Sequence, residues 1–166
     1  MTQPTRALPL NFAIPFFQGA SLEEDDYLQD RWASLLVNAV NDQSGVDLKR
    51  SYIDILERIN SLEARILEKI YSVPFETIQH VGVLTYDLPE RIHVGNEQNN
   101  SSQNQKFPSP EVVIALVNLV HLDGIRFERA WGGGEIISKV NPTLLGFYFI
   151  KACTLKTGNS DIINNS

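Results

Sequence analysis

The hydrophobic pattern of the chain is strongest between Ser21 and Asn41, where it follows the period of an α-helix. Apolar side chains recur there at i, i+4, i+7, i+8 and i+11, as Leu28, Trp32, Leu35, Leu36 and Ala39. This spacing predicts an amphipathic helix with one apolar stripe. The opposite side, which we expect to face solvent, holds Asp30, Arg31, Ser34 and Asn38. We interpret Leu28, Trp32 and Leu36 as core residues or, if exposed, as residues that bind a partner.

The start of this main helix has two readings. Ser21 and Glu24 have the spacing of a capping box, in which each side chain bonds to the other's free backbone N–H. The acidic residues 23–26 would also suit the positive end of the helix dipole if the helix began a few residues later. A cation site in this run is the less favoured interpretation, because hard cations need oxygen ligands from more than one segment. The polar residues 41–45 end the helix.

A short helix is expected before the main helix. It would lie within residues 13–20, after Pro15, because proline is favoured at the first position of a helix. Phe16, Phe17 and Leu22 would then pack against the main helix.

Two further helical stripes come after the main helix. Residues 52–59 carry the first stripe, and we expect its cap at Asp47 or Ser51. Asn60 and Glu63 then have the spacing of a second capping box, ahead of a stripe that continues up to the next proline. Three successive helices with short connections predict an antiparallel helical bundle.

The middle of the chain has a mixed pattern. Residues 78–86 are β-branched and aromatic enough for a strand, although residues 75–81 could instead form a short helix. Residues 95–108 are rich in Asn, Gln and Ser and carry almost no apolar side chains. We expect them to form a mobile polar loop.

The last third of the chain predicts a helix, a β-hairpin and a closing helix. A helix start at Ser109 and Pro110 leads into a long apolar run, so this helix is expected to be largely buried. The hairpin consists of residues 125–131 and 135–140 around three glycines. Residues 142–153 form the closing helix.

Together these elements predict a mostly α fold with a small β-element. We expect a helical bundle, with its core helix at about residues 21–41, joined to a C-terminal winged-helix-like unit with a β-hairpin. We predict an N-terminal helical part over residues 1–73 and a linker with a possible strand and a polar loop over residues 74–108. A winged-helix-like part over residues 109–156 and a disordered tail over residues 157–166 follow.

Four motifs follow one another along the chain. An acidic run leads into LQDRWASLL, which is followed by SYIDIL, by SLEARIL and finally by NPTLLGFYFIKAC. In these motifs, over about residues 11–153, the chain resembles the Abi-alpha family of uncharacterised bacterial proteins. The last motif differs from the family pattern, since Pro142 and Thr143 stand in the reverse order. The resemblance implies a bacterial protein of abortive infection, a form of phage defence.

Composition and charge narrow the classes of partner. The 166 residues are 43% hydrophobic and 20% charged, as in ordinary globular domains, and the net charge of −6 argues against tight non-specific binding to nucleic acid. A single cysteine allows no internal disulfide, which is consistent with the bacterial cytoplasm. No apolar run is long enough for a membrane span, and the N-terminal apolar segment lacks the features of a signal peptide.

Residues with recognisable chemistry are few and scattered. His80, His93 and His121 lie far apart in the sequence, so we expect packed or surface positions for them and no zinc site. Cys153 falls on an apolar helix face, and we expect it to be a small core residue. The glycines 132–134 lack the Gly-Lys-Ser/Thr ending of a phosphate loop, and a turn explains them. We expect a non-enzymatic protein with no catalytic residue, metal or cofactor. A cryptic nuclease or other toxin enzyme is the least supported reading.

The helix-hairpin-helix order raises DNA binding as the alternative function. In DNA-binding winged helices, the helix before the hairpin enters the major groove and the hairpin contacts the backbone. Residues 110–122 contain no Lys or Arg, which disfavours that function. The hairpin offers Arg126, Arg129 and Trp131 as candidate contacts. We expect another protein as the partner, with a winged-helix DNA-binding transcriptional regulator as the alternative and a homo-oligomer as a further possibility.

Overall fold

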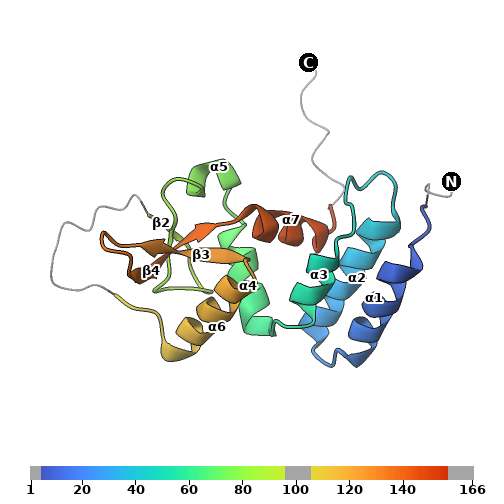
Figure 1. Ribbon diagram of the computed structural model, residues 1–166, viewed down its shortest axis with the longest axis horizontal. Coiled ribbons are helices and arrows are strands. Elements are labelled where there is room, and N and C mark those ends of the chain that lie inside the picture. The colour runs from blue at the N-terminus through green and yellow to red at the C-terminus, as the bar shows by residue number, and fades with distance from the viewer. Residues whose placement is uncertain (1–4, 96–105, 157–166) are drawn as a thin grey trace, which may run out of the picture.

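Seven helices and a four-stranded antiparallel sheet make up residues 5–95 and 106–156, the part of the chain that the computed structural model describes. The elements in order are α1 (Leu10–Leu22), α2 (Asp26–Val40), α3 (Arg50–Leu56), α4 (Ser61–Ile70), α5 (Phe75–Ile78), β1 (Val83–Leu84), β2 (His93–Val94), α6 (Pro110–His121), β3 (Ile125–Arg129), β4 (Glu135–Pro142) and α7 (Leu144–Ala152). Figure 1 shows α1, α2 and α3 at one end of the molecule and the sheet with α6 at the other. The prediction of a mostly α fold with a small β-element is confirmed.

The segment predicted as one helix over residues 21–41 is divided between two helices. α2 begins directly after Asp25, whose side chain accepts hydrogen bonds from two backbone N–H groups of the first turn. The capping box of Ser21 and Glu24 does not form. Ser21 lies instead in the last turn of α1, where its hydroxyl donates to the carbonyl of Gln18. The later of the two predicted starts is therefore the correct one.

Helix α1 is longer than predicted and holds Pro15 in its interior. The prediction that Phe16 packs on the main helix is confirmed, since its ring centroid lies 5.2 Å from that of Trp32. The same prediction is wrong for Phe17 and Leu22, which are 54% and 80% exposed. Successive residues of a helix point about 100° apart, so these two side chains are turned away from the buried face.

The side of α2 that we expected to face solvent is partly buried. Ser34 and Asn38 are only 9% and 7% exposed. The side-chain amide of Asn38 donates to the carbonyl of Ala152 at 2.8 Å and to that of Thr154 at 3.0 Å. The expectation is wrong because the end of α7 covers this side of α2. A local sequence pattern cannot predict a contact with a segment so far along the chain.

The capping box predicted at Asn60 and Glu63 is confirmed, with both reciprocal hydrogen bonds at 2.9 Å. The second carboxylate oxygen of Glu63 accepts from the side chain of Asn118 in α6 at 3.0 Å. The cap of α4 therefore also ties α4 to α6. The cap predicted for the preceding helix at Asp47 or Ser51 is wrong, because α3 begins without a side-chain cap.

Both readings of the mixed middle segment are correct in part, since it forms the short helix α5 and the strand β1. Strand β1 pairs with β2 and with β4, so the sheet order is β2-β1-β4-β3. The predicted hairpin is confirmed as β3 and β4. Most of the predicted polar loop, residues 96–105, and the predicted tail, residues 157–166, lie outside the described residues.

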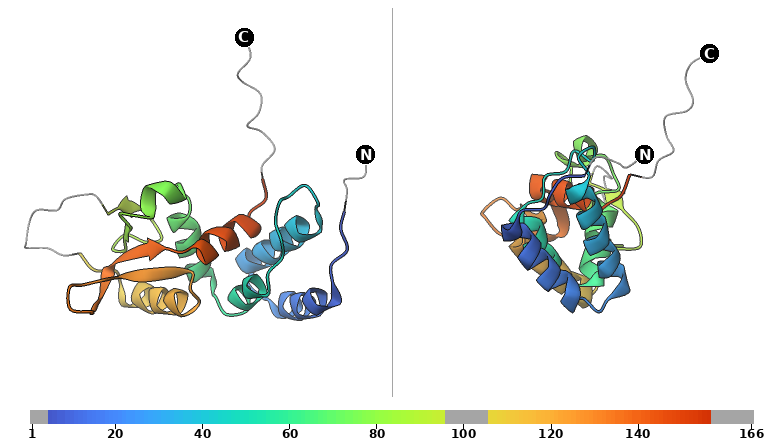
Figure 2. Two further views of the ribbon diagram at one scale, coloured as in Figure 1. Left: turned by 45° about the horizontal axis from the view of Figure 1, so that its top comes forward. Right: turned by 90° about the vertical axis from the view of Figure 1, so that its right-hand side faces the viewer.

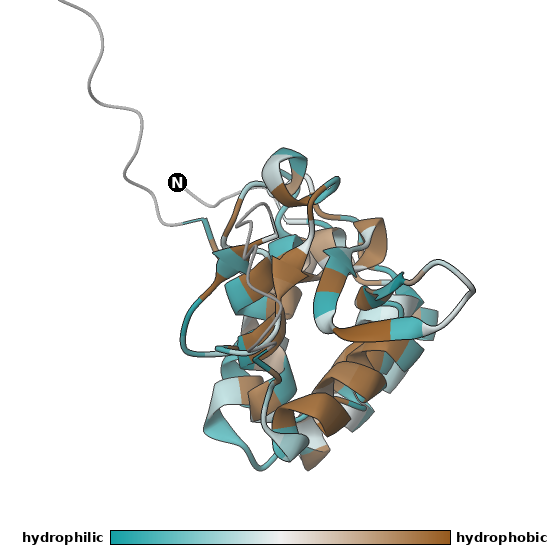
Figure 3. Ribbon diagram, turned by 90° about the vertical axis from the view of Figure 1, so that its left-hand side faces the viewer, coloured by the Kyte–Doolittle hydropathy of each residue, from teal (hydrophilic) through white to brown (hydrophobic). Residues whose placement is uncertain are grey.

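Helix α6 is less buried than its apolar sequence predicted. Leu116 and Leu119 are fully buried where α6 packs against α4 and β3. Ile114 and Val117, however, are 71% and 38% exposed. Figure 3, which looks onto the sheet end of the molecule, shows apolar residues along this helix. A helix that is apolar on most sides does not reveal which side its neighbours cover.

Helix α7 connects the hairpin to the bundle (Figure 2). Thr143 separates it from β4 and caps it, its hydroxyl accepting from the N–H of Gly146 at 3.0 Å. The Tyr71 hydroxyl accepts from the Thr143 N–H at 2.9 Å and donates to the carbonyl of Gly124 at 2.6 Å. A Cβ on Gly146 would lie within 3.0 Å of both Tyr71 and Gly124, so only glycine fits there. Since α7 also packs on α2 and α4, one hydrophobic core runs through both ends.

Candidate interaction site

The apolar stripe of α2 lies in the core of the protein. Leu28 and Trp32 are 3% and 2% exposed, and Leu36 is half-buried against the core. Trp32 lies deepest between α1 and the bundle, with its ring edge against Gly19, where a Cβ would come within 3.0 Å of the indole. These three residues offer little surface to a partner in this arrangement.

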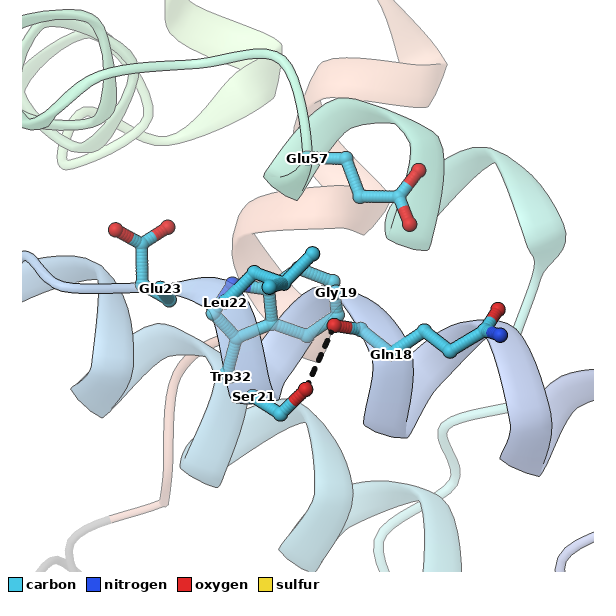
Figure 4. Close-up of a pocket in the computed structure, with 7 residues that line it drawn as sticks. All are labelled: Gln18, Gly19, Ser21, Leu22, Glu23, Trp32 and Glu57. Carbon is cyan, nitrogen blue, oxygen red and sulfur yellow. Dashed lines mark hydrogen bonds between the residues drawn. The ribbon is translucent and has the colours of Figure 1, made fainter.

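A hollow of about 630 Å³ opens beside Trp32, between the end of α1 and the end of α3 (Figure 4). Its lining consists of Gln18, Gly19, Ser21, Leu22, Glu23, Trp32 and Glu57. Sequence reasoning missed this hollow because Glu57 reaches it from α3, which only the tertiary fold brings next to α1.

Polar side chains and the aromatic ring of Trp32 together line the hollow. The Glu23 and Glu57 carboxylates lie apart from each other, one just after α1 and the other at the end of α3 (Figure 4). One oxygen of Glu23 accepts from the backbone N–H of Asp25 at 3.0 Å. Within the described residues, the buried indole N–H of Trp32 has no hydrogen-bond partner. The one hydroxyl of the lining belongs to Ser21 and donates to the carbonyl of Gln18, so it is not paired with a base.

The tip of the β3–β4 hairpin presents one large aromatic side chain to solvent. Gly132 and Gly133 have φ angles of +104° and +92°, which only glycine adopts readily, and they turn the chain sharply. The turn is closed by hydrogen bonds from Gly133 N–H to the Ala130 carbonyl at 3.0 Å and from Ala130 N–H to the Gly134 carbonyl at 2.7 Å. Trp131, held in this turn, has a relative exposure of 106%.

The two hairpin arginines predicted as contacts lie at different levels of the hairpin. Arg126 sits near its base, where the guanidinium bonds to the Asp123 carboxylate at 3.2 Å. Arg129 is exposed at the last position of β3, opposite Glu135 and close to the turn. The structure therefore brings Arg129 and Trp131 together at the tip and leaves Arg126 apart from them. We call Arg129 and Trp131 the hairpin tip.

The cations of the hairpin are largely offset by neighbouring acids. Besides the pair at Arg126, the Lys139 ammonium lies 2.9 Å from the Glu128 carboxylate. The described residues give no such acidic partner to Arg129. In the described part of the hairpin, Arg129 is thus the cation without a salt bridge, and α6 beside it carries no Lys or Arg.

A polar cluster beneath the surface joins α2 to α4. The Tyr27 hydroxyl donates to the Glu68 carboxylate, which also lies 3.1 Å from the Arg31 guanidinium. Burial, with the Glu68 carboxylate adding to it, raises the pKa of Tyr27 to about 12. Burial likewise raises the pKa of the Cys153 thiol far above its ordinary value, so this thiol stays protonated and unreactive.

The three histidines have separate surroundings and do not form a group. His93 Nε2 lies 2.7 Å from the Asp87 carboxylate, and His121 Nδ1 lies 2.9 Å from the carbonyl of Val117 in its own helix. His80 is exposed. Among residues 5–95 and 106–156, no three His, Cys, Asp or Glu side chains are grouped so that they could hold a metal ion. No helix in the same part of the chain is long and apolar enough to cross a membrane.

Comparison with known proteins places the chain in a family. No curated protein and no solved structure matches it. Residues 3–153 match the family described as abortive infection alpha, in agreement with the motifs around Trp32 and near Cys153. This match covers nearly the whole chain, which therefore belongs to the abortive infection alpha family.

Proposed function

We propose that this protein of the abortive-infection type takes part in bacterial phage defence by binding another protein through its hairpin tip, without catalysing a reaction. The observation that carries the proposal is the complete exposure of Trp131 on a turn that two glycines and two backbone hydrogen bonds define. When a partner covers a large aromatic side chain that was exposed to water, the free energy falls, and this favours binding.

The composition of the hairpin tip matches residues that dominate protein–protein binding. Trp and Arg are both enriched among residues whose truncation weakens an interface most. Trp131 would enter an apolar pocket, and the neighbouring Arg129 would bond to a carboxylate at the rim of that pocket. The expected partner is therefore a bacterial or phage protein with an apolar pocket and an acidic edge.

A winged-helix DNA-binding regulator is the alternative that the order of α6, β3, β4 and α7 raises. The ion pairs of Arg126 and Lys139 with neighbouring acids, together with the net charge of −6, favour a protein partner over DNA. We propose that the protein acts in the cytoplasm of the bacterial host. The reducing conditions there suit a protein with a single buried thiol.

A phage challenge tests the proposal. A susceptible bacterial host expresses the wild-type chain, Trp131→Ala or the matched control Ile114→Ala, which removes another exposed apolar side chain from α6. We expect the wild type and the control to lower plaque counts with early host death at high phage dose. Trp131→Ala should lose this effect while its melting temperature stays unchanged. Full protection by Trp131→Ala would contradict a role for the hairpin tip.

The class of partner is tested with purified protein. Anisotropy of labelled duplex DNA at low salt, with wild-type protein, should stay flat. Tagged wild-type protein should instead enrich a specific protein from infected cells, and Trp131→Ala should not enrich it. The opposite result would be DNA binding that depends on salt and that both Arg129→Ala and Arg126→Ala weaken. This result would favour the DNA-binding regulator over the present proposal.

A further inference from the structure

Helix α1 carries an apolar face that the described part of the chain leaves uncovered. Leu10, Ile14 and Phe17 recur at i, i+4 and i+7, so they form one stripe. They are 74%, 56% and 54% exposed, whereas Phe16 on the other side of the helix is 2% exposed. We call these three residues the α1 stripe. One helix thus buries one apolar face in the core and presents a second to water.

Contacts made by other residues of α1 hold the helix against the bundle. α1 packs on α3 and, through Phe16, on Trp32 of α2, which fixes its orientation. Figure 2 shows α1 on the outside of the bundle, at the end of the molecule away from the sheet. The core therefore does not need the outward stripe, and a row of three large apolar side chains indicates a surface that another molecule covers.

The charge of α1 indicates what that molecule is. None of its thirteen residues is charged, in a chain whose net charge is −6. A partner recognised by charge would find no group to pair with along this helix. Two copies of the chain repel one another over most of their acidic surfaces, but they can approach along α1 without bringing like charges together.

We propose that the α1 stripe binds the α1 stripe of a second copy, forming a two-fold symmetric dimer through antiparallel α1 helices. Such an interface is self-complementary, because each residue meets its symmetry mate or that mate's partner. Ile14 is the middle residue of the stripe and lies at the two-fold axis, while Leu10 of one copy packs near Phe17 of the other. The polar side chains of Asn11 and Gln18 lie along one side of the stripe and stay at the rim.

This dimer is independent of the proposed function. The hairpin tip lies at the opposite end of the molecule (Figure 1), so it stays free in both copies. The dimer would carry two tips facing away from each other, and a partner with repeated sites would then be held more tightly than by one tip.

Oligomeric state as a function of concentration is the first test. Light scattering and sedimentation of the wild-type chain should show a mass that rises with concentration toward twice the 18.7 kDa of the monomer. Ile14→Glu should weaken the dimer at least about tenfold, because a carboxylate would face its own copy at the axis. Ile114→Glu on α6 serves as the matched control, since Ile114 is also exposed and lies on another helix.

Cross-linking tests the geometry of the dimer. Ile14→Cys should form a disulfide-linked dimer under mild oxidation, because both copies meet at this residue. The native Cys153 is fully buried and adds no background. Ile114→Cys is the matched control and should remain monomeric on a non-reducing gel. Circular dichroism melts of all variants should agree with the wild type, which separates loss of the dimer from loss of the fold.

Each remaining result would overturn the inference. A monomer at every concentration, including one whose α1 stripe binds vesicles or a different protein, would assign this face to another occupant. A dimer that Ile14→Glu leaves intact, or one that Ile114→Glu disrupts equally, would place the interface elsewhere on the molecule.

Discussion

The ring of Trp32 meets the ring of Phe16 edge-on, with the centroids 5.2 Å apart and the planes at 78°. This contact joins α1 to α2, and both side chains are 2% exposed. The indole N–H is the one part of Trp32 that lacks a partner among the described residues. The buried ring therefore stabilises the fold, whereas the buried N–H without a partner destabilises it.

Two substitutions at Trp32 separate these contributions. Trp32→Ala should lower the free energy of unfolding by about 3–5 kcal/mol, because it leaves a large cavity against Phe16. Trp32→Phe should cost less than about 2 kcal/mol, because it keeps an aromatic ring and removes a buried, unpaired donor. Urea denaturation followed by circular dichroism measures both. Equal losses for the two variants would show that the indole shape as a whole is needed.

Gly146→Ala should be among the most destabilising small changes in the chain. The added methyl would lie within 3.0 Å of the Gly124 carbonyl and the Tyr71 hydroxyl, so α7 would have to shift. We expect a loss of about 3 kcal/mol in the free energy of unfolding. Gly134→Ala is the matched control, since nothing lies within 4 Å of a Cβ there. A thermal melt in which both variants match the wild type would contradict the close packing of α7.

Asn38→Leu should destabilise the fold by about 1–3 kcal/mol, although leucine is more apolar. The change removes the amide that bonds to the Ala152 and Thr154 carbonyls, and the Ala152 bond is buried. Gln79→Leu, at an exposed position at the end of α5, is the control and should change little. Chemical denaturation of the two variants gives the comparison. A stabilised Asn38→Leu would show that apolar contact outweighs these hydrogen bonds.

Alkaline pH should weaken the protein partly through Tyr27. Its pKa is raised from 10.0 to about 12 in the folded chain, chiefly by burial. Below pH 10 both states keep the proton and the stabilisation is fully present. Between about pH 10 and 12 only the unfolded chain loses the proton, so stability falls as pH rises. Tyr27→Phe should lose stability less steeply over this window, as measured by urea denaturation. Tyr52 and Tyr71, whose pKa values are also raised, are common to both proteins.

The sequence predicted those parts of the fold that local signals determine. The cap at Asn60 and Glu63 and the hairpin around three glycines are confirmed because their geometry depends on residues three or four positions apart. The start of α2 was ambiguous because Ser21 and Asp25 both have capping chemistry, and only the length of α1 decides between them.

Long-range contacts explain the rest of the differences. Asn38 looked like a surface residue until α7, more than one hundred positions away, covered it. The pairing of β1 with β4 and the hollow between α1 and α3 likewise join distant segments. The hairpin tip could be named from sequence, whereas the exposed face of α6 could not, because its apolar run has no polar side to mark the surface.

The single residue between β4 and α7 has a mechanical consequence. Thr143 is fixed on one side by the Tyr71 hydroxyl and on the other by the Asp123 carbonyl, to which its own hydroxyl donates at 2.6 Å. The base of the hairpin therefore has no hinge. A displacement of β4 at its base would therefore also move α7, and with it the packing of α7 on α2.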